Sequence, residues 1–143
     1  MSIETNKATV RRYYQEVKNQ GNLALLEELA TPDYVEHNPI LGQEQGLAGL
    51  RQRDEIMARA FRLDITVEDV IAAGDRVVVR FTNHVLHQGT FMGLPATGKS
   101  ATVQGIAFHR LQGSRIAERW ILIDNFSLLM QLGAFPQPSA PRN

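Results

Sequence analysis

The sequence predicts an α+β fold in which amphipathic helices come first and a strongly curved, mostly antiparallel sheet follows. Two observations point to it. Apolar residues recur at helical spacing up to Phe61, whereas from Leu63 onward they alternate with polar residues and are rich in β-branched types. Helices on one face of such a sheet form an α+β domain. A curved sheet wrapped around a helix leaves a conical pocket, so we expect a cone-shaped α+β barrel.

The helices are expected in three segments. Val10, Tyr13, Tyr14 and Val17 are spaced by three and four residues, which predicts a helix with one buried stripe over residues 6–19. A short helix over "LALLEELA" follows and stops at Thr31-Pro32. The third helix is predicted over residues 46–61, where leucines and other apolar residues again share one side.

Four long strands are expected after the helices, over residues 63–74, 75–89, 100–111 and 114–124. Gly74-Asp75 and Gly113-Ser114 supply turn residues between neighbouring strands, which favours an antiparallel meander.

Length and composition favour one domain. A chain of 143 residues with 43% hydrophobic residues buries enough surface for one core. We expect this domain to span residues 1–135. The last eight residues, 136–143, contain three prolines and are predicted to be a loosely attached tail.

Charge and cysteine content exclude several classes of partner. The 15 basic and 15 acidic residues balance, so we expect neither nucleic acid nor a membrane as a partner. The start, "MSIETNKATVRR", lacks the apolar segment of a signal peptide, which predicts a cytoplasmic protein. Cysteine is absent, and a metal site from His37, His87 and Asp124 is conceivable but lacks ligand spacing, so we expect no metal.

The segment "GLPATGKS", residues 93–100, matches the phosphate-binding pattern G-x-x-x-x-G-K-[ST]. A P-loop requires a helix after this turn, because the helix N-terminus holds the phosphates. The residues that follow, "ATVQGIAFHRL", have strand character. We therefore interpret the segment as a connection between two antiparallel strands.

Several short motifs follow one another in an order that resembles the SnoaL-like polyketide cyclases of the nuclear transport factor 2-like superfamily. The resemblance covers nearly the whole chain, up to Gly133. The matching positions are His37-Asn38-Pro39 with Gly42; His87, Gly89 and Gly93; Pro95, Thr97, Gly98 and Lys99; Trp120 and Asp124; and Gln131-Leu132-Gly133.

This resemblance implies an α+β cone and an intramolecular aldol condensation without metal or organic cofactor. Asp124 stands at the position of the family's acid/base aspartate. Some of these cyclases carry a histidine fourteen residues earlier, where this chain has Arg110, with His109 beside it.

The neighbours of Asp124 agree with an acid/base role. It follows the apolar run "RWILI", and a carboxylate among such neighbours loses hydration, which raises its pKa towards neutrality. The alternative is that Asp124 caps the turn into "NFSLLMQ".

The hairpin register decides which residues accompany Asp124. A two-residue turn at Gly113-Ser114 would set His109 opposite Glu118, whereas a bulged loop would set Arg110 there. We favour the bulged register, with Gln104, Phe108 and Arg110 facing the cavity beside Trp120. The alternative for Arg110 is a structural pair with Glu118.

The remaining candidates lie elsewhere in the chain. His37 and His87 could reach the mouth of the cone as acid/base groups, although either could instead fix a loop. The candidate catalytic residues are therefore Asp124, His37, His87 and Arg110, and the candidate substrate-binding residues are Tyr14, Asn38, Gln104, Phe108 and Trp120.

Together these residues predict a cofactor-independent enzyme that acts on a small apolar carbonyl compound. The alternatives are a hydrolase or isomerase of the same fold, or a non-catalytic binding or assembly module. An apolar outer sheet face that includes Ile121 and Ile123 further suggests a homodimer.

Overall fold

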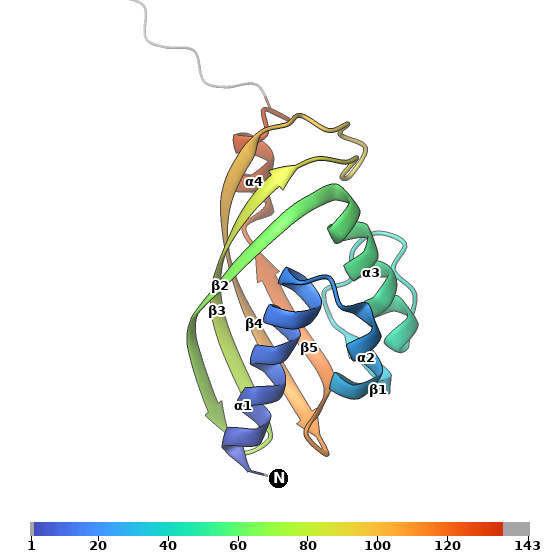
Figure 1. The fold of residues 1–143 in the computed structure, drawn as a ribbon, viewed down its shortest axis with the longest axis vertical. Coiled ribbons are helices and arrows are strands. Elements are labelled where there is room, and N and C mark those ends of the chain that lie inside the picture. Colours follow the sequence, from blue (N-terminus) through green and yellow to red (C-terminus); the bar gives the residue numbers. More distant parts are fainter. Residues whose placement is uncertain (1, 136–143) are drawn as a thin grey trace, which may run out of the picture.

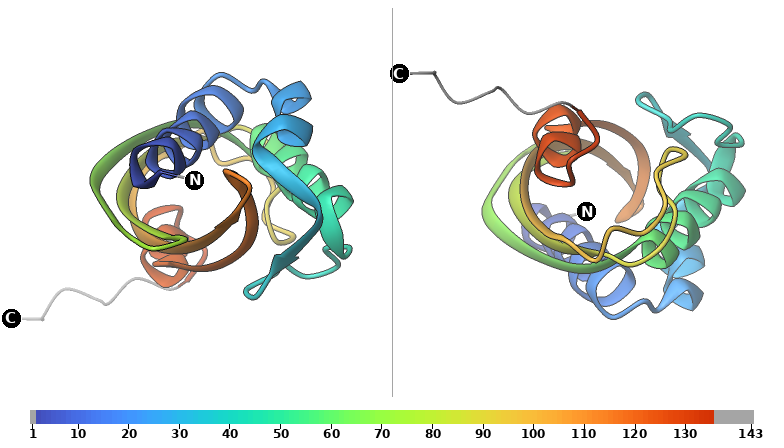
Figure 2. Two further views of the ribbon diagram at one scale, coloured as in Figure 1. Left: turned by 90° about the horizontal axis from the view of Figure 1, so that it is seen from below. Right: turned by 90° about the horizontal axis from the view of Figure 1, so that it is seen from above.

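The structure is a computed structural model that describes residues 2–135. Residues 136–143, for which the sequence predicts a proline-rich tail, lie outside the described residues. The strands curl into an incomplete ring when seen end-on, and the helices that precede Phe61 lie across its open side (Figure 2). The predicted α+β architecture is confirmed (Figure 1).

One five-stranded sheet forms the cone, in the order β1-β5-β4-β3-β2. Neighbouring strands are antiparallel except β1 and β5, which are parallel. The strands are β1 (Ala30–Glu36), β2 (Phe61–Ala73), β3 (Arg76–His87), β4 (Ser100–Gln112) and β5 (Arg115–Ile123). The four predicted strands are therefore confirmed, and β1 is an additional one that the sequence did not reveal.

The helices occupy the predicted segments and one further segment. α1 (Ile3–Arg12) begins at Ser2, whose hydroxyl accepts the N–H of Thr5, and α3 (Gly46–Ala60) follows the expected range. A 3-10 turn, η2 (Leu23–Leu25), leads into α2 (Leu26–Leu29). The unexpected helix is α4 (Asn125–Gln131) at the end of β5.

The end of the first helix is wound more widely than an α-helix. α1 continues as a π-helical segment, η1 (Tyr13–Asn19). Tyr13 and Tyr14 are consecutive, yet each side chain is only 1% exposed. Both rings therefore enter the interior of the cone, where they meet edge to face at 5.0 Å.

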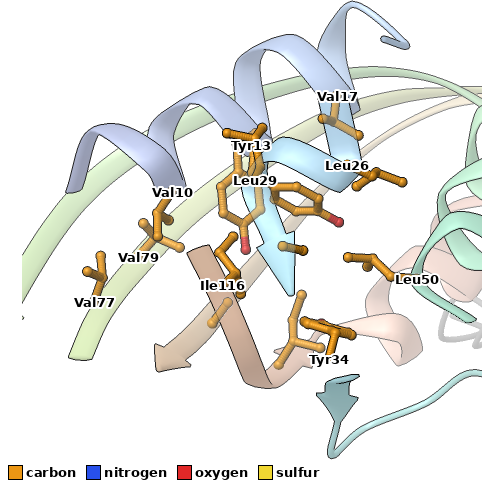
Figure 3. Packing of buried hydrophobic residues seen from close by; sticks show 14 of the residues in the cluster. Val10, Tyr13, Val17, Leu26, Leu29, Tyr34, Leu50, Val77, Val79 and Ile116 are labelled. Carbon is orange, nitrogen blue, oxygen red and sulfur yellow. The ribbon is translucent and has the colours of Figure 1, made fainter. Parts of the chain in front are cut away.

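The main core lies between these helices and the concave face of the sheet (Figure 3). Val10 of α1 lies beside Val77 and Val79 of β3, and Val17 of η1 lies beside Leu26 of α2. Burying an aliphatic side chain of this size contributes about 1.5–3 kcal/mol, so this contact holds the helical layer on the strands.

Small residues of β4 face the inside of the curve. Ala107 is fully buried, and a Cβ atom at Gly105 would overlap the ring of Phe81. The concave face has little room because aromatic rings from the helix and from β3 fill it. The larger neighbours of these residues, including Phe108, consequently lie on the convex face.

The predicted pairing of Arg110 with Glu118 is confirmed, but its origin differs from the expectation. The Gly113-Ser114 turn is a two-residue turn that pairs Gln112 with Arg115. The register changes beyond it because β5 bulges, and Ile116 and Ala117 are both buried although they are consecutive. This bulge decides which residues of β5 face inward.

The segment 93–100 joins β3 to β4 and is followed directly by strand. The interpretation of this motif as a strand connection is confirmed.

Candidate functional site

A cavity of about 890 Å³ opens at the mouth of the cone. Its walls come from α3, the segment after β1, the connection between β3 and β4, the end of β5 and the first residue of α4. Most of the wall is apolar. The residues that line it are His37, Asn38, Pro39, Ile40, Leu41, Arg53, Ile56, Phe91, Met92, Gly93, Ile121, Leu122, Ile123 and Asn125.

Asn38 fixes the segment after β1 on the edge of β5. The last backbone bond between the strands runs from the N–H of His37 to the carbonyl of Arg119 (2.9 Å). Further along, the side-chain oxygen Oδ1 of Asn38 accepts the N–H of Ile121 at 2.9 Å. Because Oδ1 must face this donor, the amide group Nδ2 is left without a hydrogen bond within residues 2–135. Asn38 therefore brings an available N–H donor to the cavity wall.

His37 stands at the rim of the cavity in a defined orientation. Its ring lies flat on Trp120, with ring centroids 4.3 Å apart and an interplanar angle of 3°. Its Nε2 lies 2.7 Å from Oε2 of Glu118, and the other carboxylate oxygen, Oε1, accepts Nε–H of Arg110. Hydrogen bonds from His37 and then Arg110 lower the pKa of Glu118, so this carboxylate is ionised and only accepts.

The pairing with Glu118 determines where His37 can act as a base. Nε2 must carry the proton that is donated to the carboxylate. In the neutral ring Nδ1 is then unprotonated, and it has no hydrogen bond within the described part of the chain. His37 can therefore take up a proton at Nδ1 while Glu118 stabilises the resulting cation.

A buried network of charged and phenolic groups lies behind the cavity. Arg119 is 2% exposed and donates to both carboxylate oxygens of Glu36. Tyr34 donates to the same carboxylate at 3.1 Å, and burial raises the pKa of this tyrosine. Arg53 donates from Nη1 to Glu36 (3.3 Å) and to the carbonyl of Asn38 (2.9 Å), and it is also part of the cavity wall.

The network continues to a second ion pair beside η1. Lys18 lies 2.9 Å from Asp54, which also accepts the hydroxyl of Tyr13. Burial lowers the pKa of Lys18, while burial and then Asp54 raise the pKa of Tyr13. The tyrosines therefore stay protonated and act as hydrogen-bond donors.

Two predicted site residues are buried inside the cone, away from the cavity wall. Tyr14 donates its hydroxyl to His109, and burial raises its pKa to about 12. His87 is fully buried, and its Nδ1 accepts the N–H of Thr97. This hydrogen bond fixes the connection between β3 and β4 to the end of β3. The alternative given for His87, a histidine that fixes a loop, describes this geometry.

Asp124 is exposed, which corrects the expectation that apolar neighbours enclose it. It is the N-cap of α4, and its Oδ1 accepts the N–H of Ser127 at 3.0 Å. The alternative interpretation, a cap for the segment "NFSLLMQ", describes this geometry. Asp124 borders a hollow of about 570 Å³ on the convex face of the sheet, together with three predicted partners: Gln104, Phe108 and Trp120.

The expectation that Gln104, Phe108, Arg110 and Trp120 face the cavity is wrong. They lie on the convex face because small residues occupy the concave side of β4 and the bulge at Ala117 turns Arg119 inward. Arg110 instead forms an ion pair with Glu118, which is the structural role that the sequence analysis gave as its alternative.

Sequence reasoning missed Arg53, which lines the cavity. A signal for it exists, because Arg53 and Asp54 occupy the same helical stripe as Leu50 and Met57. Charged residues in an apolar stripe indicate buried ion pairs or a polar site.

The sequence profile of the SnoaL-like polyketide cyclases matches residues 8–132. The chain belongs to this family. Solved structures of similar proteins agree with the fold. TsrD from Streptomyces laurentii matches 94% of this chain and 99% of its own, with 26% identity and a TM-score of 0.86.

Two further neighbours carry different functional descriptions. IdmH from Streptomyces antibioticus, a candidate polyketide cyclase, is 29% identical over 90% of this chain and 98% of its own, with a TM-score of 0.79. AclR from Streptomyces galilaeus, a candidate hydroxylase, is 27% identical over 96% of this chain and 87% of its own, with a TM-score of 0.82. A comparison with curated proteins gives no match.

Two structural features are absent from residues 2–135 of this SnoaL-like chain. No group of three or more His, Asp or Glu side chains there could hold a metal ion. None of the helices in the same range has both the length and the apolar character needed to cross a membrane.

Proposed function

We propose that this protein is a cofactor-independent enzyme that removes a proton next to the carbonyl of a small apolar compound, as in an intramolecular aldol condensation. The observation that carries the proposal is the pair of His37 and Glu118 at the rim of the apolar cavity. A positioned base of this kind accelerates proton transfer by about 10²–10⁴-fold.

The enolate formed by this step needs a hydrogen-bond donor. A developing oxyanion is stabilised by donors that are already in place. Nδ2 of Asn38 is such a donor, because the bond between Oδ1 and the N–H of Ile121 fixes the amide. We therefore place the base at Nδ1 of His37 and the oxyanion donor at Asn38.

Hydrogen exchange tests the proposed step without the natural substrate. An aryl methyl ketone is incubated with the protein in D₂O, and NMR measures the loss of its methyl protons. We expect His37→Gln to lower the protein-dependent rate by at least 100-fold. We expect Asp124→Asn to leave the rate unchanged, because Asp124 does not line the cavity.

The control for the histidine is His84→Gln, since His84 is exposed and lies outside the cavity wall. An unchanged exchange rate in His37→Gln, or no exchange above the buffer rate with the unaltered protein, contradicts the proposal. A loss in Asp124→Asn that exceeds the loss in His37→Gln assigns the base to Asp124 instead.

We further propose that a second copy of the chain covers the convex face. Ile121 and Ile123, which the sequence suggests for this contact, point towards the interior. The apolar patch consists instead of Ile106, Phe108 and Leu122, which are 53%, 41% and 73% exposed. Ile106 pairs directly with Leu122, so the patch is continuous, and continuous exposed apolar patches mark protein contacts.

A further inference from the structure

The buried network behind the cavity holds more positive than negative groups. Lys18 is matched by Asp54, and Arg119 is matched by Glu36. Arg53 has only a longer contact of 3.3 Å with the Glu36 carboxylate, which Arg119 already engages through both oxygens. Three cations therefore face two carboxylates.

The unmatched charge is located at the cavity. The side chain of Arg53 is 8% exposed, and Arg53 is part of the cavity wall. Its two hydrogen bonds both use Nη1, so Nε–H and Nη2–H₂ have no acceptor within residues 2–135. A guanidinium presents its N–H groups as a flat fork that matches the two oxygens of a carboxylate.

The rest of the wall offers nothing that would neutralise this charge. None of the described residues that line the cavity is an aspartate or glutamate. Burial, and then the positive charge of Arg119, lower the pKa of Arg53. An anion in the cavity would restore the balance and accept the free N–H groups.

We propose that the cavity binds a substrate that carries a carboxylate, which Arg53 holds through Nε and Nη2. The apolar body of this molecule lies against Ile56, Phe91 and Ile121, and its carbonyl lies towards Asn38 and His37. This inference rests on the proposed function for the same cavity and names the class of substrate, an apolar keto acid.

A matched pair of ligands tests the carboxylate subsite without any reaction. 1-Naphthoate and 1-naphthamide have nearly the same shape and differ in charge, and isothermal titration calorimetry measures both affinities. We expect the protein to bind naphthoate about 10- to 100-fold more tightly than naphthamide, the range for hydrogen bonds to a charged group.

Substitution of Arg53 tests whether this residue carries the preference. We expect Arg53→Met to reduce the affinity for naphthoate to that for naphthamide and to leave the affinity for naphthamide unchanged. Arg51→Met is the matched control, because Arg51 lies on the same helix and its charged end pairs with the exposed Glu27. The control is expected to keep the full preference for the carboxylate.

A measurement on the unaltered protein covers the case in which Arg53→Met does not fold. The Nε–Hε resonance of Arg53 is followed by NMR during addition of each ligand. We expect naphthoate to shift this resonance and naphthamide to leave it in place. Equal affinities for the two ligands, or no binding of either, overturn the inference. A preference that persists in Arg53→Met also overturns it.

The result is separable from that of the exchange experiment. Naphthoate binding that depends on Arg53, together with exchange that does not depend on His37, supports the carboxylate subsite and contradicts the proposed catalysis. Exchange of a neutral ketone that depends on His37, without any preference for the carboxylate, supports the catalysis and overturns only this inference.

Discussion

His109 is expected to make the protein sensitive to mild acid. Its Nδ1 lies 3.0 Å from the carbonyl oxygen of Val77, which can only accept, so Nδ1 carries the proton. Nε2 then accepts the hydroxyl of Tyr14 at 3.0 Å. Burial, and then the positive charge of Arg119, lower the pKa of His109 from 6.5 to about 3.

The sign and size of the effect follow from this shift. Between pH 6.5 and 3 the unfolded chain binds a proton at His109 that the folded protein does not bind. The free energy of unfolding therefore falls as the pH falls through this window. The contribution lost is about 1.4 kcal/mol at pH 5.5 and about 2.7 kcal/mol at pH 4.5, relative to neutral pH.

The perturbation that isolates this contribution is His109→Asn, which keeps a donor near Val77 and removes the titrating group. The variant is expected to be less stable at pH 7.5 by about 1–3 kcal/mol, because Tyr14 loses its acceptor. Urea unfolding of both proteins gives the difference in free energy of unfolding at each pH. We expect the difference to shrink by about 1.4 kcal/mol between pH 7.5 and 5.5.

Other titrating groups, including Glu118 and the remaining histidines, are common to both proteins and cancel in the difference. A difference that stays constant from pH 7.5 to 4.5 refutes the reasoning, because His109 would then titrate alike in the folded and unfolded chains. The ring proton shifts of His109 give a direct check, since they should not change down to pH 4.5 in the folded protein.

Two further predictions concern the convex side of the sheet. Asp124→Ala removes the acceptor for the N–H of Ser127 and should lower the free energy of unfolding by about 1 kcal/mol, as measured by urea unfolding. Asp124→Asn keeps a capping oxygen, so its free energy of unfolding should stay within about 0.5 kcal/mol of that of the unaltered protein. Equal losses in the two variants would contradict a capping role. Leu122→Glu should convert the proposed dimer to a monomer, as measured by light scattering, without loss of stability. Ile71→Glu changes an exposed residue outside the patch and should leave the dimer intact. A monomeric unaltered protein would disprove the dimer.

The periodicity of the sequence was sufficient to predict the helices and the four long strands. β1 was not predictable in this way because it has seven residues, contains Pro32, and pairs with β5 more than 80 positions later in the chain. Proline is tolerated there because β1 lies at the edge of the sheet. A short edge strand of this kind is recognisable only once its partner is known.

The face of each strand was harder to predict than the strand itself. Strict alternation along β5 would place Ile116, Glu118 and Trp120 on one face. The bulge makes Ile116 and Ala117 both face inward, after which Arg119 and Ile121 follow on the inner face. One extra residue therefore exchanges the two faces for the rest of the strand, and nothing in the composition of "RIAERWILI" reveals its position.

The candidate site was predictable where it depends on a loop motif. His37 and Asn38 were identified from the sequence, and both line the cavity. Their partners were not, because Glu118 reaches His37 only through the parallel pairing of β1 and β5. Arg53 could not be assigned to the cavity without knowing which part of α3 lies beneath the segment after β1.

Protonation has opposite consequences for the two candidate bases. Asp124 accepts the N–H of Ser127, so taking up a proton would weaken the bond that caps α4. His37 donates to Glu118, so taking up a proton at Nδ1 would strengthen the bond that orients its ring. A base whose orienting hydrogen bond strengthens when it accepts a proton keeps its orientation through the reaction. A capping carboxylate loses its orienting hydrogen bond when it accepts a proton. This difference, together with the position of His37 in the cavity wall, which Asp124 does not line, is why we place proton transfer at His37.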